Sequence, residues 1–273
     1  MERYELDYIK MDYNVPSQTG SEGYTGTPTD DPLYKHLQGT SELWRWMRAN
    51  YPDLVIENCS SGSKRADLMT TALTDTHWTS DEVDNIPNLV INYGATNFFP
   101  PEMNSDWTTY PEEEGNKHIL DIPARFTANM FVHFGLSGEI QDWREDTMQI
   151  LKERIATYKD YRDVIRNAEV YHLTRQPNHI EPQSATALQL VDVREDRPIH
   201  SLVYVFHAND PELKTRLRLR ELSPEKLYQV VFPEELGGHE YTMKGEDLLM
   251  DGLEIDFRNK GTAGIVKILS TWD

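Results

Sequence analysis

The stretch that decides the fold reads Asp7-Tyr8-Ile9-Lys10-Met11-Asp12-Tyr13-Asn14. Within it, an apolar, β-prone run stops abruptly at Asp12, and a polar loop containing Pro and Gly follows over residues 15–26. A strand of an α/β barrel presents a catalytic carboxylate in this way, on rigid backbone at its carboxyl end. An isolated Asp at such a position is more often a turn former that ends the strand. The context favours the catalytic interpretation.

The composition of the 273-residue chain narrows the class of protein. Its hydrophobic content of 38% is typical of a globular protein, and its length suffices for one large domain or two ordinary ones. The formal net charge of −19 excludes nucleic acid and anionic membrane surfaces as expected partners, because phosphate binding needs clustered Lys and Arg. No apolar run in the sequence is long enough to span a bilayer.

The single cysteine, Cys59, excludes an intrachain disulfide and a zinc site made of several thiolates. It fits a reducing compartment. Residues 1–5 lack the basic start and apolar middle of a signal peptide, so we expect a cytoplasmic protein. The 9 His residues show no ligand spacing, and we therefore expect neither a metal nor another cofactor.

The first part of the chain alternates strand-like and helix-like segments. Strands are predicted at residues 7–12, 54–56 and 76–81, and helices at 34–50 and 65–73. The first helix has an apolar face, which comprises Leu37, Leu43, Trp44 and Met47. The second strand delivers Glu57, Asn58 and Cys59 into the loop over 60–63. Strands that alternate with helices and end in polar residues are typical of a parallel α/β fold.

The segment over 97–116 is rich in Pro, acidic and aromatic residues and is too long for a simple connection. It predicts a lid or a loop at the substrate rim, with a solvated acidic excursion as the equal alternative. We then expect a helix over 122–134, a tight turn over 135–139 and a long helix over 142–167. Asp142 and Glu145 have the spacing of a capping box at the start of that last helix.

The pattern changes after residue 168. Leu alternates with Arg over 216–220, apolar residues alternate with acids over 253–257, and apolar runs cover 203–206 and 264–269. Such alternation between turn signals is typical of antiparallel sheets. We therefore predict two domains, a catalytic α/β domain over 1–168 and an antiparallel β-sandwich over 169–273.

Two of the predicted parallel strands end in acids, Asp12 and Asp81. Because the carboxyl ends of barrel strands open on the same face, the two carboxylates would flank one sugar. Such a pair serves as nucleophile and general acid/base in glycoside hydrolysis, since one acid stays ionised while the other holds a proton. Spacing alone supports this only weakly.

Three segments resemble motifs of one known family. Residues 10–14 resemble a Lys-Trp-Asp-x-Asn nucleophile motif, and residues 57–68 resemble Glu-Asn-Cys-x-Ser-Gly-Gly-x-Arg-x-Asp-Leu. Residues 78–81 read Trp-Thr-Ser-Asp, as in an acid/base motif. These are motifs of glycoside hydrolase family 36, the bacterial-type α-galactosidases. They follow the family's order, and weaker matches extend the resemblance over nearly the whole chain.

The resemblance implies a retaining glycosidase that cleaves terminal α-linked galactose from galactosides. Asp12 would attack the anomeric carbon, and Asp81 would protonate the leaving oxygen and later activate water. Retaining geometry implies carboxyl groups about 5 to 5.5 Å apart. Lys10 lies two residues before Asp12, on the same side of the strand, and is expected to bind sugar hydroxyls and keep Asp12 ionised.

The resemblance implies further substrate-binding residues, namely Asn14, Cys59, Gly62, Arg65 and Trp78. Gly62 would permit close approach of the backbone to the sugar. A structural role is the alternative for three of them. Cys59 would then be a buried core thiol, Arg65 would pair with Asp67, and Trp78 would be a core aromatic rather than a sugar platform.

The chain also departs from the family pattern. Met11 replaces the usual Trp, and Ser63-Lys64 stands where a second Gly is common. Members have a large amino-terminal β domain and three barrel strands before the nucleophile strand, at which this chain starts. We therefore expect about strands four to eight of a (β/α)8 TIM-type barrel, in a fragment of a longer enzyme. The exposed edge would be completed by the missing amino-terminal part or by a second copy in a homo-oligomer.

The predicted function is therefore α-galactosidase activity on a galactoside or oligosaccharide, weak or absent in the isolated chain. Hydrolysis of α-linked N-acetylgalactosamine and transfer of galactose to another sugar are alternatives within the family. A different class of function is a non-catalytic remnant that binds carbohydrate or protein. Such a remnant would have no reason to keep Lys10, Asp12, Cys59 and Asp81 together.

Overall fold

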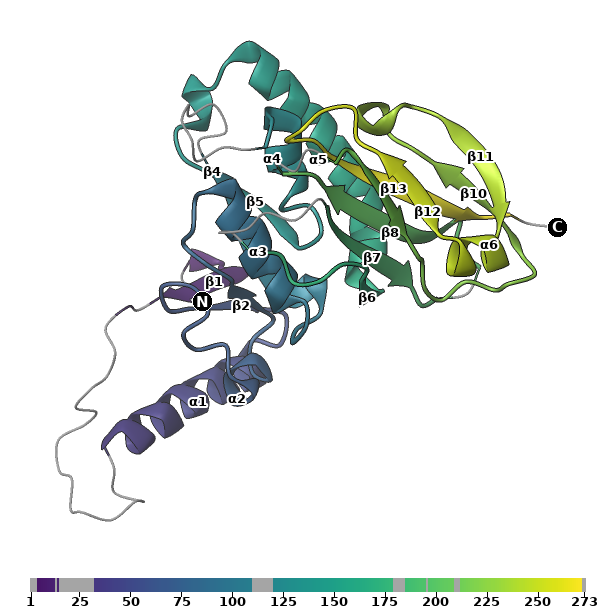
Figure 1. The fold of residues 1–273 in the computed structure, drawn as a ribbon. Coiled ribbons are helices and arrows are strands. Elements are labelled where there is room, and N and C mark those ends of the chain that lie inside the picture. Colours follow the sequence, from purple (N-terminus) through teal and green to yellow (C-terminus); the bar gives the residue numbers. More distant parts are fainter. Residues whose placement is uncertain are drawn as a thin grey trace. The chain divides into compact units, whose positions relative to one another are not determined.

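The computed structural model describes residues 4–12, 14, 32–109, 120–178, 185–194, 196–208 and 212–271. The chain forms two compact units, Met1–Asp81 and Glu82–Asp273, and each is described by itself. Figure 1 labels their helices and strands. The domain boundary expected between residues 168 and 169 stays a prediction.

The first unit contains three neighbouring parallel strands and two helices. Its elements are β1 (Tyr8–Asp12), α1 (Pro32–Asn50), β2 (Val55–Cys59), α2 (Leu68–Thr71) and β3 (Thr76–Trp78). β1 pairs in parallel with β2, so that Asp12 lies opposite Cys59, and β2 pairs in parallel with β3. The predicted parallel strand–helix repeat is therefore confirmed in this unit. Two strand ends differ from the prediction, because β2 extends through Cys59 instead of ending before Glu57, and β3 ends at Trp78 instead of at Asp81.

One face of β1 packs toward α1. Side chains of a strand alternate between its two faces, so Met11 lies on the face opposite Asp12. Met11 packs against a buried cluster that contains Trp44 and Met47, and the Trp44 indole donates a hydrogen bond of 2.8 Å to the Met11 Sδ. Leu37 and Leu43 are exposed, so the apolar face of α1 is narrower than predicted. This packing leaves the other face of β1 to Lys10 and Asp12.

The second unit joins α/β elements to antiparallel sheets. The first group comprises α3 (Asn85–Ala95), the 3-10 helix η3 (Pro101–Met103), β4 (Asn104–Thr109), α4 (Ile122–Thr127), β5 (His133–Ser137), the 3-10 helix η4 (Ile140–Asp142) and α5 (Glu145–Arg166). β4 and β5 pair in parallel. The parallel strands that the structure describes do not close into a barrel.

The antiparallel part of the second unit follows α5. Its elements are β6 (Ala168–His172), β7 (Thr186–Asp192), β8 (Ile199–Phe206), β9 (Lys214–Leu217), β10 (Leu227–Val231), the 3-10 helix η5 (Glu234–Leu236), β11 (Glu240–Lys244), α6 (Gly245–Met250), β12 (Leu253–Asp256) and β13 (Ala263–Ser270). Six strands form one sheet in the order β11-β10-β13-β8-β7-β6, and β12 pairs with β9. The predicted antiparallel sheets are confirmed.

The central strands of the six-stranded sheet are covered on both faces, and every residue of β7 is buried. On one face, Leu188 and Leu190 belong to a cluster with Ile165 of α5, which runs beside this sheet in Figure 1. On the other face, Ala187 belongs to a cluster with Ile255 of β12. The sheet therefore forms a middle layer between helices and the β9–β12 pair.

Two predicted connections contain strands instead. Part of the segment predicted as a lid over 97–116 forms η3 and β4, and its residues from 110 onward lie outside the described part of the chain. The helix predicted over 122–134 ends at Thr127, and the turn predicted over 135–139 overlaps β5. Parallel pairing between β4 and β5 overrides the local pattern. A Cβ on Gly135 would lie 2.4 Å from the Asp106 carbonyl oxygen, so this pairing needs glycine there.

The predicted capping box is wrong. Helix α5 begins at Glu145, its N-cap is Arg144, and no side chain caps it. Asp142 ends the preceding 3-10 turn and so cannot cap α5. Acidic residues in the first turn, Glu145 and Asp146, still match the positive end of the helix dipole.

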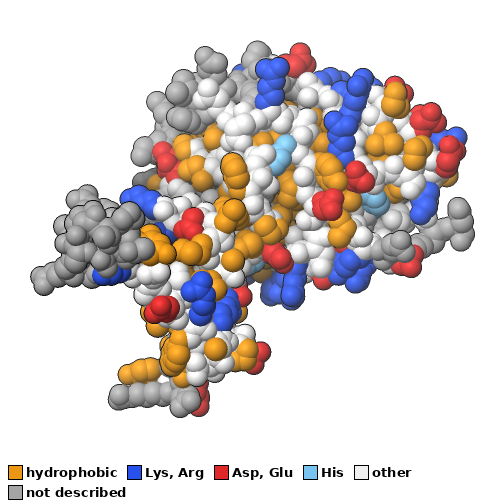
Figure 2. All heavy atoms as spheres, turned by 90° about the horizontal axis from the view of Figure 1, so that it is seen from below, with side chains coloured by type: hydrophobic (Ala, Val, Ile, Leu, Met, Phe, Trp, Pro, Cys, Tyr) orange, Lys and Arg blue, Asp and Glu red, His pale blue; other side chains and the backbone are white. Residues whose placement is uncertain are grey.

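The surface carries charged side chains of both signs (Figure 2). On the face drawn in Figure 2, Lys and Arg side chains lie interspersed with Asp and Glu. Within the described ranges, every helix is too short or too polar to cross a membrane.

Helix α6 offers a matched test of the core. Leu248 is fully buried and Met250, two residues later, is 65% exposed. Leu248→Ala should lower the free energy of unfolding by about 2–5 kcal/mol, because it removes buried methyl groups and leaves a cavity. Met250→Ala should change it by less than about 0.5 kcal/mol. Urea denaturation measures both, and equal losses in the two variants would contradict the described core.

Candidate active site

The carboxyl ends of β1, β2 and β3 bring the predicted site residues to one edge of the first unit. The β1–β2 register places Asp12 opposite Cys59. Trp78 ends β3, and Asp81 follows three residues later. Both Asp12 and Asp81 are exposed, so a ligand at this edge has access to both carboxylates. Parallel strands present their ends in this way because they run in the same direction.

Lys10 is held in place by two neighbours. Its Nζ lies 3.0 Å from the Glu57 Oε1 and 3.6 Å from the centre of a ring of Trp78. Glu57 is buried, with 5% of its side chain exposed, and also accepts a hydrogen bond from the Tyr8 hydroxyl. The ion pair and the cation–π contact fix the ammonium group above the indole.

Trp78 links Lys10 to Asp81. Its indole nitrogen donates a hydrogen bond of 2.9 Å to the Asp81 Oδ1. The Trp78 side chain is buried, and the Lys10 ammonium covers one ring face. Trp78 therefore orients the predicted acid/base residue, and that covered ring face is not free to serve as a sugar platform.

Cys59 contacts the predicted nucleophile. Its thiol is buried, and burial raises the pKa of Cys59 to about 11. A hydrogen bond with the Asp12 carboxylate and its negative charge also raise this pKa, whereas Lys10 and the Gly62 backbone oppose the shift. The thiol is therefore protonated at neutral pH and is able to donate its hydrogen to Asp12.

The loop after β2 is folded onto the end of β3. Gly62 has a φ of +83°, and a Cβ there would lie 3.0 Å from the Thr79 carbonyl oxygen. The Ser63 hydroxyl donates a hydrogen bond of 2.8 Å to the same oxygen. At the other side of the loop, the Asn14 Oδ1 accepts a hydrogen bond of 2.7 Å from the Ser61 backbone nitrogen. Gly62 is thus needed for close backbone packing.

Arg65 follows this loop. Its carbonyl oxygen accepts a hydrogen bond of 3.0 Å from the Asn58 side chain, which ties the loop back to β2. Asp67 caps α2 by accepting hydrogen bonds from the backbone nitrogens of Met69 and Thr70. The helix predicted over 65–73 is thus confined to Leu68–Thr71, because its cap fixes where it begins.

The predicted residues therefore share one edge, joined by contacts from Asp12 to Cys59 and from Lys10 through Trp78 to Asp81. This arrangement offers two accessible carboxylates, a fixed ammonium and a thiol hydrogen. Such groups suit hydroxyl binding and acid/base or nucleophilic chemistry at a sugar. Among the described residues, no cluster of three or more His, Cys, Asp or Glu side chains fits a metal ion.

Tyr8 and Glu57 were not among the residues predicted to form the site. Tyr8 precedes Lys10 by two residues and so lies on the same face of β1. Glu57 is opposite Lys10 in the β1–β2 register. The alternation of side chains along β1 could have indicated Tyr8, because it places Tyr8 on the same face as Lys10. The contact between Glu57 and Lys10 could be predicted only from the register between β1 and β2.

The comparison with family models assigns the chain to a family. The model described as Melibiase matches residues 1–168, which is more than half of the chain. The chain belongs to the Melibiase family. Among its curated relatives, an α-galactosidase of Lactobacillus acidophilus is 25% identical over 243 residues, covering 88% of this chain and 32% of the relative. An α-galactosidase of Geobacillus stearothermophilus is 24% identical over 259 residues, covering 93% and 33%.

Solved structures of α-galactosidases share the fold of this Melibiase chain. The Lactobacillus brevis enzyme has a TM-score of 0.83 and 21% identity, covering 100% of this chain and 36% of that one. The Geobacillus stearothermophilus enzyme has a TM-score of 0.81 and 22% identity, covering 97% and 35%. The chain therefore spans about a third of the length of these relatives.

The single thiol makes the contact between Cys59 and Asp12 measurable. With a pKa of about 11, Cys59 should react with a disulfide reagent at pH 8 more than about a hundredfold more slowly than in the unfolded chain. Asp12→Asn removes a negative charge that raises this pKa, so the native reaction should become faster. Absorbance of the released thiolate gives both rates.

Asp53→Asn is the matched control, because Asp53 is exposed in the turn between α1 and β2. It should leave the rate unchanged. An equal rate in the parent chain and in Asp12→Asn would argue against the described contact.

A second polar cluster lies in the second unit around Asp106 of β4. Asp106 is fully buried and accepts hydrogen bonds from the Trp107 backbone nitrogen, at 2.7 Å, and from the Asn92 side chain. Burial raises the pKa of Asp106 to about 7, and the hydrogen bonds only partly oppose this. The folded chain therefore holds a proton here that the unfolded chain would release at lower pH.

This shift predicts a pH dependence of stability. Between the unfolded pKa, about 4, and the folded pKa, about 7, the native state binds more protons, so the Asp106 contribution is lost as pH rises. Asp106→Asn should flatten the decline of unfolding free energy over that range, relative to the parent. Asp251→Asn, at an exposed position, should retain the parent slope. Urea denaturation at several pH values measures the unfolding free energy of each chain. If that free energy declined equally with pH in all three chains, the raised pKa of Asp106 would be contradicted.

Proposed function

We propose that this chain carries the catalytic pair of a retaining α-galactosidase, with Asp12 as nucleophile and Asp81 as general acid/base. The observation that supports it most is the contact network at the ends of β1, β2 and β3. It joins Asp12, Cys59, Lys10, Trp78 and Asp81, all within the segment that matches the Melibiase model. The related α-galactosidases support the choice of sugar.

In the first step, an Asp12 carboxylate oxygen attacks the anomeric carbon and forms a glycosyl ester. The bond from that carbon to the leaving oxygen breaks, and Asp81 gives its proton to this oxygen. The hydrogen bond from Trp78 holds the Asp81 carboxyl group in position. The Cys59 thiol hydrogen orients the attacking carboxylate of Asp12.

In the second step, Asp81 takes a proton from water as the water oxygen attacks the same carbon. The ester to Asp12 breaks, and the sugar leaves with its original anomeric configuration. Lys10 and Asn14 are proposed to bind sugar hydroxyls at this edge, with Arg65 beside them. Gly62 is also proposed to line the sugar site; its buried α-carbon packs against the backbone of Thr79 and Ser80.

The proposed parent fold is a TIM-type barrel to which this chain contributes about strands four to eight. The parallel pairing of β1 to β3 and of β4 with β5 supports it, as does the coverage of about a third of the relatives. The remaining strands would come from an upstream part or from a second copy of the chain. A cytoplasmic setting stays part of the proposal, since a chain with a single cysteine fits a reducing compartment.

The proposed substrates are α-galactosides of the oligosaccharide type. Solved structures of the related Geobacillus stearothermophilus enzyme hold raffinose and stachyose. Met11 faces the α1 core and not the Asp12 face, so its difference from the family motif affects packing behind the site. N-acetylgalactosaminide hydrolysis and galactosyl transfer are tested in the same assay with the corresponding substrate and acceptor.

The test measures hydrolysis of an aryl α-galactoside by the 273-residue chain, alone and with the upstream part of the Lactobacillus brevis enzyme supplied as a separate polypeptide. We expect weak turnover alone and faster turnover in the mixture. Asp12→Ala should reduce the rate at least about a thousandfold and Asp81→Ala about 100- to 10,000-fold. Asp53→Ala, at an exposed position, should retain it.

Azide distinguishes the two roles. Added to Asp81→Ala it should capture the glycosyl ester and give α-galactosyl azide, whereas with Asp12→Ala it should replace the nucleophile and give β-galactosyl azide. Proton NMR identifies each product. Undiminished turnover in Asp12→Ala, the opposite azide anomers, or no turnover by a folded chain in either setting would refute the proposal.

A further inference from the structure

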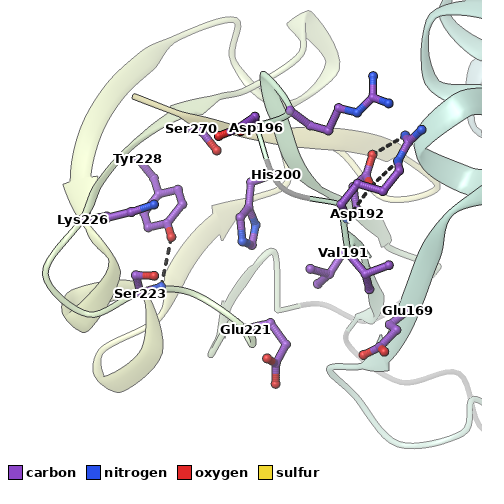
Figure 3. A pocket seen from close by; sticks show the side chains of 13 residues that line it. Glu169, Val191, Asp192, Asp196, His200, Glu221, Ser223, Lys226, Tyr228 and Ser270 are labelled. Carbon is purple, nitrogen blue, oxygen red and sulfur yellow. Dashed lines mark hydrogen bonds and ion pairs between the residues drawn. The ribbon is translucent and has the colours of Figure 1, made fainter. Parts of the chain in front are cut away.

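A large hollow lies in the second unit, at the end of the six-stranded sheet. It has a volume of about 590 Å³ and is lined by polar and charged side chains from β7, β8 and the segment before β10. In Figure 3, His200 lies between Lys226 and Tyr228 on one side and Asp192 on the other. A hollow of this size accommodates a small organic ligand.

The charges that line this hollow nearly balance. Four carboxylates line it, those of Glu169, Asp192, Asp196 and Glu221. Three cations line it as well, those of Arg194, Arg197 and Lys226. Burial lowers the pKa of His200, whereas a hydrogen bond with the Glu221 backbone opposes this shift, and the imidazole is neutral at pH 7. The site therefore favours neither a strong anion nor a strong cation.

The cations differ in how firmly they are held. Arg194 bonds to Asp192 at 2.6 Å and to Asp163 at 2.8 Å, so it forms part of the wall. Arg197 and Lys226 are exposed at the hollow. Their donors are therefore available to a ligand.

Neighbouring groups and the backbone conformation also position the carboxylates that line the hollow. The Tyr171 hydroxyl donates a hydrogen bond of 2.8 Å to Glu169 and also interacts with Glu221. Glu221 and Asp196 have φ values of 53° and 60°, a conformation that side chains other than glycine rarely adopt. Backbone strain of this kind persists where surrounding contacts hold it and is common at ligand sites.

An aromatic hollow adjoins the polar one. It has a volume of about 420 Å³, and Glu169 lines both. Phe98, which is 81% exposed, and Tyr171 line it. Aromatic faces pack against the apolar C–H faces of sugar rings, while hydroxyl groups need the donors and acceptors of the polar hollow.

From this combination we propose that the paired hollows, which consist of residues of the second unit alone, are a second carbohydrate site that binds a neutral oligosaccharide. One sugar unit lies in the polar hollow, with hydroxyls bonded to Arg197, Lys226 and Glu221. The next unit packs on Phe98. This site goes beyond the proposed catalytic function and does not depend on it.

Other ligand chemistries fit less well. An inorganic anion such as phosphate would meet four carboxylates, and the described residues contain no group suited to a metal ion. A neutral polyhydroxyl compound uses donors and acceptors of both kinds without adding charge. The balanced lining therefore favours a sugar.

The experiment is calorimetric titration of the full Asp12→Ala chain with maltotriose and with cellotriose, because neither sugar carries the α-linked galactose that the Asp12 edge is proposed to bind. We expect a dissociation constant in the millimolar range for at least one. The double variant Arg197→Ala, Lys226→Ala and the single variants Glu221→Gln and Phe98→Ala, each made in that background, should weaken binding at least about tenfold. Inorganic phosphate serves as the comparison ligand.

The double variant Lys152→Ala, Lys159→Ala and the single variant Glu225→Gln are charge-matched controls at exposed positions outside both hollows, and they should bind as the background chain does. Circular dichroism checks that each variant is folded. The proposal is overturned if neither sugar binds at up to about 50 mM, if the hollow variants bind like the controls, or if phosphate binds more tightly than both sugars.

Discussion

A buried carboxylate, that of Glu57, sets the layout of the candidate active site. A charge removed from water in this way needs an opposite charge and hydrogen-bond donors close by. The strand register supplies both, because it places Lys10 opposite Glu57 and leaves Tyr8 within reach of the same group. Lys10 is then committed to one position, above the Trp78 ring.

This fixed position of the Lys10 side chain limits its chemical role. With its ammonium shared between Glu57 and the indole face, Lys10 acts as a fixed positive point rather than as a mobile cation. The same indole orients Asp81, so the orientations of Lys10 and Asp81 depend on one aromatic side chain. Asp12 is oriented separately, through the Cys59 thiol. Two independent supports for two carboxylates suit chemistry in which the acids have different tasks.

The sequence predicted the parts of this site that depend on local pattern. The strand end at Asp12 follows from an apolar run that stops at a polar residue, and Lys10 follows from the period of two. The third strand was predicted to end at Asp81, but β3 ends at Trp78. The role of Glu57 did not follow, because it arises from pairing between strands and not from the order of residues within one. Strand β4 was missed for a related reason. Its residues include Asn104 and Asp106, which are polar yet buried, and their burial depends on partners such as Asn92 that are distant in the sequence.

The central strands of the six-stranded sheet are covered on both faces, which limits where the chain can be cut into separately folding parts. Leu188 and Leu190 pack with helical residues that precede residue 168, and Ala187 packs with strands that follow it. A cut at the point where the parallel pattern gives way to the antiparallel one would expose an apolar sheet face to water. In gene fusion or recombination, the sheet and the helices of the second unit would therefore have to be inherited as one piece.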